Sequence, residues 1–273
     1  MSDLREQRLR GPSWVRAVTD HPLLLPVVAL GLRALTVRES VAFLVRQLLR
    51  QGGVFAYRPR ACSQIKVLVR HGPSDPIILG EVFHEHDYEP PAELPPIEPR
   101  RIVDLGANVG YFGAFALERW PGSSVIAYEP DPISAAVHAR TIELNDLGDR
   151  WTLRRVAAAD RDGELRFHAW GHATSHAADD GDVVVPARDV LPVIAGADLL
   201  KIDTEGGEWP ILADPRFAAA PPRVVVLEYH PEGAPGPDPR AAVLDYLARA
   251  GLTATASIFQ RADGYGMLWA WRP

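Results

Sequence analysis

Residues 101–118, RIVDLGANVGYFGAFALE, combine the signals of a strand, a glycine-containing turn and a helix. The apolar stretch that ends at Val103 is typical of a buried strand. From Tyr111 onward, apolar side chains recur with the spacing of one helix face. The loop between them, residues 104–110, consists mostly of small residues that let the backbone approach a ligand, and the first N–H groups of the helix point to the same place. The pattern predicts a ligand-binding turn.

The spacing of the glycines narrows the class of ligand. A dinucleotide-binding turn would follow the pattern G-x-G-x-x-G. Here Gly106 and Gly110 bracket Asn108, so the third small position arrives one residue early. This spacing favours a nucleoside cofactor without a pyrophosphate over NAD. The residues of this turn that we expect to contact the cofactor are Asp104, Gly106, Ala107, Asn108, Gly110 and Tyr111.

A second strand, expected at residues 125–128, ends in an acidic tip. Glu129 follows it, 19 residues after Gly110, and its carboxylate can accept hydrogen bonds from both ribose hydroxyls of an adenosine group. Either signal alone also fits an ordinary corner between a strand and a helix, but the two together predict a nucleoside-binding α/β domain. We expect Glu129, Pro130 and Asp131 to contact the cofactor.

A third strand is expected at residues 151–156, and small residues follow it. Ala157 and Ala158 would let a flat adenine ring lie against the backbone. Asp160 can serve either the turn or the adenine amino group, and the sequence leaves both roles open. We expect these three residues to lie at the cofactor site.

Residues 198–212 place two carboxylates directly after another buried strand, at 199–202. Asp203 and Glu205 stand beside a glycine pair, and in an open α/β sheet the carboxyl ends of the strands face the ligand. Two carboxylates at one strand tip are costly unless they bind cations or polar groups. The alternative is a charged turn in which Glu208 caps the next helix. We favour Asp203 and Glu205 as site residues.

The composition argues against several classes of protein. The formal net charge of −6 over 273 residues argues against a general nucleic-acid binder, which needs a basic face. Cys62 is the one cysteine, which excludes an intrachain disulfide and a thiolate metal cluster. No leader pattern opens the chain, and the longest apolar run, residues 23–32, is too short to span a bilayer. We expect a soluble cytoplasmic protein without stable membrane insertion.

The first third of the chain is expected to be a separate unit. We predict a helical and β-hairpin subdomain at residues 1–96, on the substrate side, and a cofactor-binding domain at residues 97–273. Residues 23–49 have helical periodicity, which favours an ordinary helix packed on the main domain over a membrane-surface helix or a dimer contact. Three short strands should follow, at residues 55–57, 65–69 and 77–82.

Four polar residues at 84–87, HEHD, could suggest a metal site. Adjacent positions of an extended segment point to opposite faces, so a shared ion would need a turn. A solvated acidic loop is favoured and no metal is expected. The rest of the chain continues the α/β pattern. The elements expected there are helices at 133–144 and 241–250, strands at 164–170 and 223–229, a polar loop at 171–181, and a closing hairpin at 254–259 and 266–271. The predicted fold is a Rossmann-like α/β domain whose mostly parallel sheet has an antiparallel C-terminal edge.

Four segments, VDLGANVGYF, YEPDP, AAADRDGEL and LLKIDTEGGEWPIL, resemble the FkbM-type S-adenosylmethionine-dependent methyltransferases in order and spacing. The upstream segment GPSDPIILGEVFHEHDYEPP resembles the part that precedes the first motif of that family, so the similarity covers roughly residues 65–230. The most specific part is KIDTEGGE, where Thr204 and Gly207 are mild departures from the family pattern. The matching positions are Lys201, Asp203, Glu205, Gly206 and Glu208.

The resemblance implies a class I methyltransferase fold, S-adenosyl-L-methionine as cofactor, and methyl transfer mostly to hydroxyls of sugars, glycolipids or secondary metabolites. An alcohol must lose its proton as the new bond forms, and a positioned general base contributes about 10²–10⁴-fold to the rate. His230, at the tip of the strand at 223–229, is the first candidate because its imidazole is expected to titrate near neutral pH. Asp203 and Glu205 are the alternatives, either as base or as hydrogen-bond partners of substrate and cofactor, and Asp203 is also expected to contact the cofactor.

Three other functions stay open at this level. The acceptor could be an amine or a carboxylate instead of a hydroxyl. The chain could also be a non-catalytic adenosine-binding protein on the same fold. A metal-dependent methyltransferase with Asp203, Glu228 and His230 as ligands is the least favoured option. A small-molecule substrate is the expected partner, a homodimer is compatible with the sequence, and no nucleic acid is expected.

Overall fold

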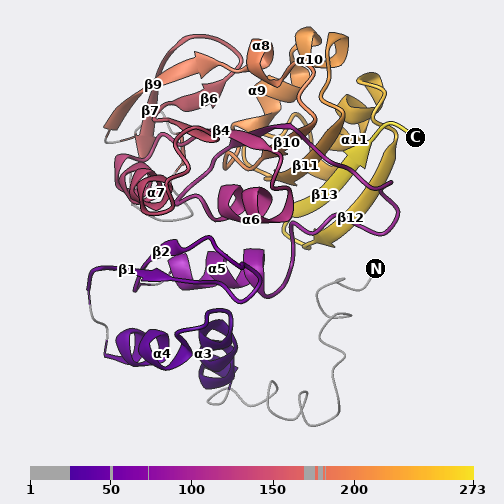
Figure 1. The fold of residues 1–273 in the computed structure, drawn as a ribbon. Helices are drawn as coiled ribbons and strands as arrows, with labels where there is room; N and C mark the ends of the chain where they lie inside the picture. Colours follow the sequence, from indigo (N-terminus) through magenta and orange to yellow (C-terminus); the bar gives the residue numbers. More distant parts are fainter. Residues whose placement is uncertain (1–24, 50–51, 73, 169–175, 178–180, 182) are drawn as a thin grey trace.

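The computed structural model describes residues 25–49, 52–72, 74–168, 176–177, 181 and 183–273 (Figure 1). Its centre is a seven-stranded sheet with the order β12-β13-β11-β10-β3-β4-β5. In chain order these strands are β3 (Arg101–Leu105), β4 (Ser124–Tyr128), β5 (Trp151–Arg154), β10 (Leu199–Ile202), β11 (Val224–Tyr229), β12 (Ala254–Gln260) and β13 (Gly266–Trp271). Strands β5, β4, β3, β10 and β11 are parallel, and β13 pairs antiparallel with β11 and β12. The predicted sheet with an antiparallel C-terminal edge is confirmed.

Helices cover both faces of this sheet, and the period of two along each strand divides the core accordingly. Ile102 of β3 belongs to the apolar cluster of α6 and α7. Its neighbours Val103 and Leu105 belong to the opposite cluster, with residues of α9 and α11. The helices are α6 (Tyr111–Arg119), α7 (Pro132–Leu144), α8 (Leu191–Ile194), α9 (Glu208–Ala213), α10 (Pro215–Ala219) and α11 (Pro239–Arg249). Burial on both faces explains why the central strands are nearly continuous apolar runs.

A second, four-stranded sheet lies beside α7 in Figure 1, with the order β6-β9-β7-β8. Its strands are β6 (Ala157–Ala159), β7 (Gly163–His168), β8 (His176–Ala177) and β9 (Val183–Asp189). The strand predicted at 164–170 is confirmed as far as residue 168, whereas β9 was not predicted. The polar loop predicted at 171–181 falls largely outside the described residues.

The N-terminal unit lies at the lower end of the molecule in Figure 1. It contains α3 (Leu25–Leu35), α4 (Ser40–Leu48), β1 (Val54–Tyr57), β2 (Val67–Arg70) and α5 (Asp75–Phe83). The helical region predicted at 23–49 is two helices, separated at Val37, which forms an isolated bridge with Pro59. Strands β1 and β2 form an antiparallel hairpin, as predicted. The domain boundary predicted after residue 96 stays a prediction.

The strand predicted at residues 77–82 is wrong, because these residues belong to helix α5. Asp75 lies in the first turn of α5 and accepts hydrogen bonds from the backbone and the guanidinium of Arg70. Pro76 follows at an early helical position, where its missing N–H leaves no bond unmade. The helix is buried on several sides, so its apolar residues show no amphipathic spacing and imitate a buried strand.

Side-chain hydrogen bonds join the N-terminal unit to the main sheet and its helices. Tyr111 at the start of α6 donates to the carbonyl of Leu68 in β2 (3.1 Å). Glu118 at the other end of α6 accepts from the backbone N–H groups of residues 63–65. Asn145, after α7, pairs with both backbone groups of Lys66 (2.8 and 2.7 Å). These bonds hold β2 and the segment before it against α6 and the end of α7.

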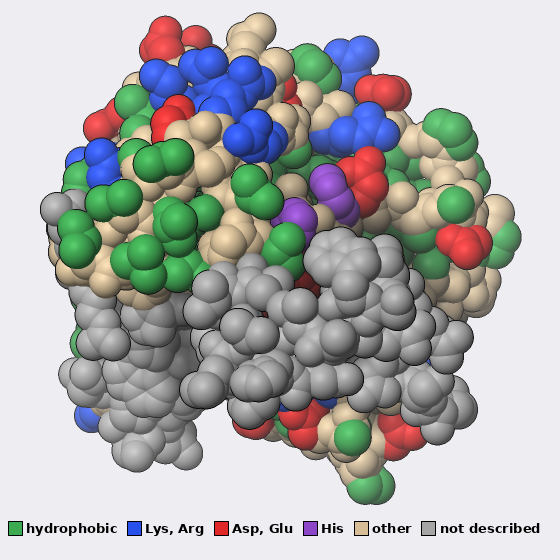
Figure 2. All heavy atoms as spheres, turned by 90° about the horizontal axis from the view of Figure 1, so that it is seen from below, with side chains coloured by type: hydrophobic (Ala, Val, Ile, Leu, Met, Phe, Trp, Pro, Cys, Tyr) green, Lys and Arg blue, Asp and Glu red, His purple; other side chains and the backbone are tan. Residues whose placement is uncertain are grey.

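Helices α3 and α4 expose an apolar surface. Figure 2 views the molecule from this end and shows hydrophobic side chains gathered on the part of the face that is described. The large exposed side chains of this region are Leu32, Leu35, Val41, Val45, Leu48 and Leu49. Neither a membrane-surface role nor a dimer contact is tested by this arrangement. Within the described ranges, no helix has the length and apolar character needed to cross a membrane.

Candidate active site

A cavity of about 570 Å³ opens at the carboxyl ends of the parallel strands. The loop after β3, the tip of β4 and the loop after β10 form its floor, together with the tip of β11. Helix α5 supplies Ile78, Glu81 and Val82 to one wall, and the turn between β12 and β13 supplies Arg261 and Tyr265 to another. The cavity therefore lies where an open α/β sheet places its ligand.

Glycine is required at two positions of the loop after β3. Gly106 has a φ of +78°, and a side chain there would collide with the backbone carbonyl of Asp203. Gly110, the N-cap of α6, has a φ of +91°, and a Cβ atom there would lie 2.7 Å from the ring of His138. Asn108 between them also has positive φ, +48°. The backbone consequently passes directly over the tips of β3 and β10, which brings Asn108 to the cavity.

Glu129 lies at the tip of β4 and lines the cavity, although its side chain is buried. One carboxylate oxygen accepts from the backbone N–H of Asn108 (2.7 Å), and the other from that of Asp131 (2.8 Å). Each oxygen keeps a second lone pair that can accept a further hydrogen bond. Burial raises the pKa of Glu129 to about 7, although the two N–H donors oppose this rise.

Nine of the thirteen predicted cofactor contacts line the cavity, and four do not. The nine are Gly106, Ala107, Asn108, Tyr111, Glu129, Pro130, Ala157, Ala158 and Asp203. Asp131 caps α7 instead, where its carboxylate accepts from the N–H groups of Ile133 and Ser134 (2.8 and 3.2 Å). Asp160 lies away from the cavity with its carboxylate 3.8 Å from Arg161. Asp104 and Gly110 lie below the lining residues, against Lys201 and His138 respectively.

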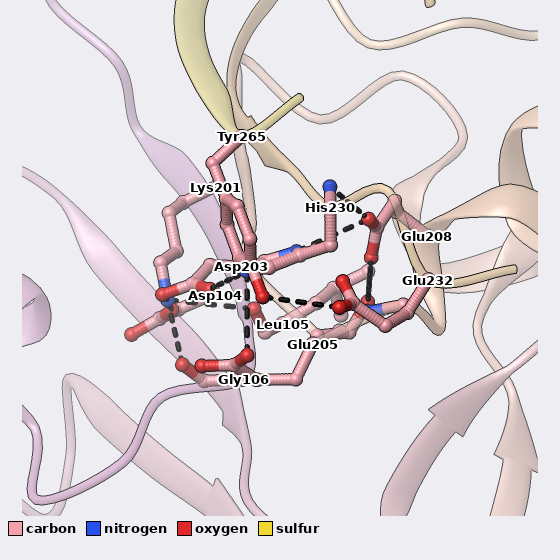
Figure 3. Close-up of polar contacts among 12 residues, drawn as sticks. Asp104, Leu105, Gly106, Lys201, Asp203, Glu205, Glu208, His230, Glu232 and Tyr265 are labelled. Carbon is pink, nitrogen blue, oxygen red and sulfur yellow. Dashed lines mark hydrogen bonds and ion pairs between the residues drawn. The ribbon is translucent and has the colours of Figure 1, made fainter. Parts of the chain in front are cut away.

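Lys201 connects the two halves of the site (Figure 3). Its ammonium group is buried, lies 3.3 Å from carboxylate oxygens of both Asp104 and Asp203, and donates to the carbonyl of Gly106 (2.6 Å). Burial lowers the pKa of Lys201, but the two carboxylates outweigh that effect and raise it to about 12. A fixed positive charge therefore holds the glycine loop and the tip of β10 together.

Glu208 organises the turn after β10, also drawn in Figure 3. Its side chain is fully buried, and one carboxylate oxygen accepts from Gly206 N (3.0 Å) and the Thr204 hydroxyl (3.2 Å). The other oxygen accepts from the backbone N–H of His230 (2.8 Å) and contacts its Nδ1 (3.1 Å). The expected alternative role of Glu208 as a helix cap is thus replaced by a bridge between the tips of β10 and β11.

The three predicted catalytic residues converge. His230 Nε2 lies 3.4 Å from Glu205 Oε2 and 4.0 Å from Asp203 Oδ1. Burial lowers the pKa of His230, but the carboxylates of Glu208, Asp203 and Glu205 outweigh it and raise it to about 10. The expectation of a near-neutral imidazole is therefore wrong for this arrangement of charges. Burial and Asp203 raise the pKa of Glu205 to about 8. The role of His230 as general base stays a prediction. It would require the imidazole to lose the proton that its raised pKa retains at neutral pH.

Several side chains of the site were absent from the predicted set. Lys201 was noted only as a motif position and Glu208 also as a helix cap, because nothing in the sequence shows that their side chains turn inward. Glu81 was missed because its helix was expected to be a strand. Tyr265 comes from a turn without a local signal, and its ring stands edge-on to His230 at 5.2 Å.

Comparison with known families agrees with this geometry. Residues 104–252, more than half of the chain, match the family described as Methyltransferase FkbM domain. The chain belongs to the FkbM methyltransferase family. The family predicted from the sequence motifs is confirmed, and with it the class of enzyme that the family name states.

Curated relatives share parts of the chain. Methyltransferase sdnD of Sordaria araneosa is 38% identical over 69 residues, which cover 25% of this chain and 26% of that protein. The 2-O-methyltransferase NoeI of Sinorhizobium fredii is 28% identical over 173 residues, 54% of this chain and 70% of NoeI. The first match thus spans about a quarter of the relative's length.

The fold is shared with a solved structure. The crystal structure of methyltransferase FkbM from Methylobacillus flagellatus aligns with a TM-score of 0.50 at 14% identity, over 93% of this chain and 60% of that one. At this identity the likeness concerns the fold. It confirms the predicted class I methyltransferase architecture.

Proposed function

We propose that the protein transfers a methyl group from S-adenosyl-L-methionine to a hydroxyl of a small molecule. The observation that carries this proposal is a single cavity with two kinds of wall. The glycine loop and Glu129 line one side, and Asp203, Glu205 and His230 line the other. A nucleoside site and a cluster of proton-accepting groups are the two parts that alcohol methylation needs.

The residues present fit the proposed cofactor. Glu129 has acceptor capacity left on both carboxylate oxygens, which suits two ribose hydroxyls. The side-chain oxygen of Asn108 is buried without a hydrogen-bond partner among the described residues, and it can accept from a bound polar group. Ala157 and Ala158 leave room for a flat ring. When bound, S-adenosyl-L-methionine would supply an activated methyl group on a positively charged sulfur.

The acceptor side of the cavity favours a neutral group that donates hydrogen bonds. Asp203, Glu205 and Glu228 line this side, so an incoming group meets mainly hydrogen-bond acceptors, to which an anionic carboxylate acceptor has nothing to donate. A hydroxyl can donate to these carboxylates, which align its oxygen and receive its proton as the new bond forms. The name of NoeI, a 2-O-methyltransferase, supports the same choice. Sugars, glycolipids and secondary metabolites are the acceptors that we propose.

Calorimetry with S-adenosyl-L-methionine tests the cofactor. We expect the wild type to bind, Glu129→Ala to lose at least tenfold in affinity, and Glu143→Ala, a change at an exposed position of α7, to bind like the wild type. Absence of binding in the wild type, or unchanged affinity in Glu129→Ala, would overturn the proposed cofactor site.

Methyl transfer to matched acceptors tests the chemistry. With labelled cofactor, we expect products from a panel of polyhydroxylated compounds and none from the corresponding amines or carboxylic acids, with mass spectrometry locating the methyl group. Glu205→Gln, which leaves the contacts of Lys201 in place, should lower turnover at least tenfold with little change in cofactor affinity. Products from amines or acids alone would refute the hydroxyl assignment.

A further inference from the structure

We propose that Asp203, Glu205 and His230 bind one divalent metal ion of the Mg²⁺ or Mn²⁺ class. Each of these residues offers one ligand atom to the cavity, and the three atoms lie within 4.8 Å of one another. They form a mixed set of two carboxylate oxygens and one imidazole nitrogen. Carboxylate oxygens suit both Mg²⁺ and Mn²⁺, and Mn²⁺ also accepts an imidazole nitrogen. Either ion keeps other coordination positions for water or substrate oxygen. This assignment replaces the earlier expectation that the chain has no metal site.

The orientation of His230 is the first observation behind this proposal. The residue is 2% exposed, so its ring has one fixed environment. Glu208 can only accept as a carboxylate, so the contact at 3.1 Å places a proton on Nδ1 of His230. Nε2 then faces the cavity, and it makes no hydrogen bond to any described residue that meets ordinary geometry. A carboxylate behind a histidine whose second nitrogen faces an ion is the usual arrangement around metal-binding histidines.

The two carboxylates are held from behind in the same way. Lys201 lies 3.3 Å from one oxygen of Asp203, which leaves the other, Oδ1, directed to His230. Glu205 has a φ of +51°, and the buried carboxylate of Glu208 fixes the turn around it through Gly206 N. Because these contacts already fix the orientations of the two carboxylates, their side chains lose little conformational entropy when an ion binds.

The charge of the cavity is the second observation. Its lining contains six carboxylate side chains and three basic ones, counting His230. Lys201 is already shared between Asp104 and Asp203, so it cannot neutralise Glu205 or the neighbouring Glu228. Carboxylates gathered in a partly buried cavity repel one another unless a cation lies between them. A divalent ion at the three ligand atoms would supply the missing charge.

The consequence for catalysis rests on the proposed function, whereas binding of the ion does not. An ion at this position would polarise the acceptor hydroxyl and hold its oxygen near the cofactor side of the cavity. In the transfer, the oxygen–carbon bond forms and the sulfur–carbon bond breaks. The hydroxyl proton passes to water, because Asp203 and Glu205, which would receive it without the ion, are then ligands. His230 is then a ligand and not the general base.

Titration with Mn²⁺ in the absence of substrate and cofactor tests the site. Calorimetry and the electron paramagnetic resonance signal of free Mn²⁺ should both report one ion per chain. We expect Glu205→Gln and Asp203→Asn each to weaken binding at least tenfold, while Glu143→Gln leaves it unchanged. Thermal unfolding checks that the variants fold, since a folded variant gives a cooperative transition. Mn²⁺ should raise the midpoint of the wild type and of Glu143→Gln but of neither site variant. No Mn²⁺ binding by the wild type, or equal binding by a folded site variant, would overturn the proposal.

A second comparison separates this site from the proposed function. Calorimetry with S-adenosyl-L-methionine in the presence of EDTA should still show binding, but turnover should fall at least tenfold and return with Mn²⁺. Full turnover in EDTA would remove the metal and leave the methyltransferase proposal intact. Binding of Mn²⁺ without any binding of the cofactor would support the metal site and overturn the proposed function.

Discussion

At the scale of single residues, the acids of the site differ in what surrounds them. Glu129 was predicted from its position alone, because a carboxylate directly after a buried strand must face the carboxyl edge of the sheet. Asp131, two residues later, was predicted as a cofactor contact but serves as a helix cap. The sequence does not distinguish these roles, since both carboxylates bind backbone N–H groups and only the course of the chain decides which one reaches the cavity.

The raised pKa of Glu129 predicts a pH dependence of cofactor binding. Its value of about 7 means that the free protein holds this proton below neutral pH, whereas two ribose hydroxyls require the carboxylate. We expect the affinity for S-adenosyl-L-methionine to fall as pH drops below 7, by about tenfold per unit. Calorimetry between pH 5.5 and about 8.5 measures this slope. Glu129→Gln should bind weakly with no such slope, and the same slope in that variant would assign the proton to another group.

At the scale of elements, the strands were predicted more reliably than the helix next to the site. β3, β4, β10 and β11 are buried on both faces, so a short apolar run suffices to identify them. Helix α5 is also apolar on most sides and therefore has no period that separates it from a strand. Its first turn, with Asp75 and Pro76, carried the missing signal, but a proline after an acidic residue also fits a turn.

Removal of the cap of α7 tests the structural role of Asp131. Asp131→Ala leaves the N–H groups of Ile133 and Ser134 without their acceptor, so we expect a loss of about 1–2 kcal/mol in the free energy of unfolding. Asp131→Asn, which retains an acceptor oxygen, should lose less. Urea denaturation measures both, and calorimetry should find a smaller loss of cofactor affinity in Asp131→Ala than in Glu129→Ala. The reverse order of affinities would return Asp131 to the cofactor contacts.

At the scale of the whole molecule, the parallel arrangement of the main sheet and its antiparallel edge followed from alternating strands and helices, but the order of the strands was not predicted. The contact between the N-terminal unit and this sheet was not predicted from the sequence. That contact depends on side chains such as Tyr111, Glu118 and Asn145, which are far from their partners in sequence. The charges that set the pKa of His230 were missed for the same reason, since Glu208 lies 22 residues away.

Glu118 is the side chain whose loss should loosen the N-terminal unit most directly. Its hydrogen bonds to Ser63, Gln64 and Ile65 lower its pKa, although burial opposes this. Because the pKa is lower in the folded protein, this stabilisation is present above the unfolded value near 4.5 and is lost as pH falls through the folded value. Hydrogen exchange at pH 7 should be faster in residues 63–70 of Glu118→Ala than of the wild type, while Glu143→Ala matches the wild type. Equal exchange in all three proteins would show that other contacts hold the unit.

The ammonium group of Lys201 has a consequence for how this enzyme can diversify. It joins the glycine loop after β3 to the tip of β10, so a change at either place disturbs the donor and acceptor sides together. Ile78 and Val82 of α5 and Tyr265 of the final hairpin line the same cavity from elements outside these bonds. Substitutions in α5 and the final hairpin can therefore change the acceptor preference without disturbing the site of the methyl donor.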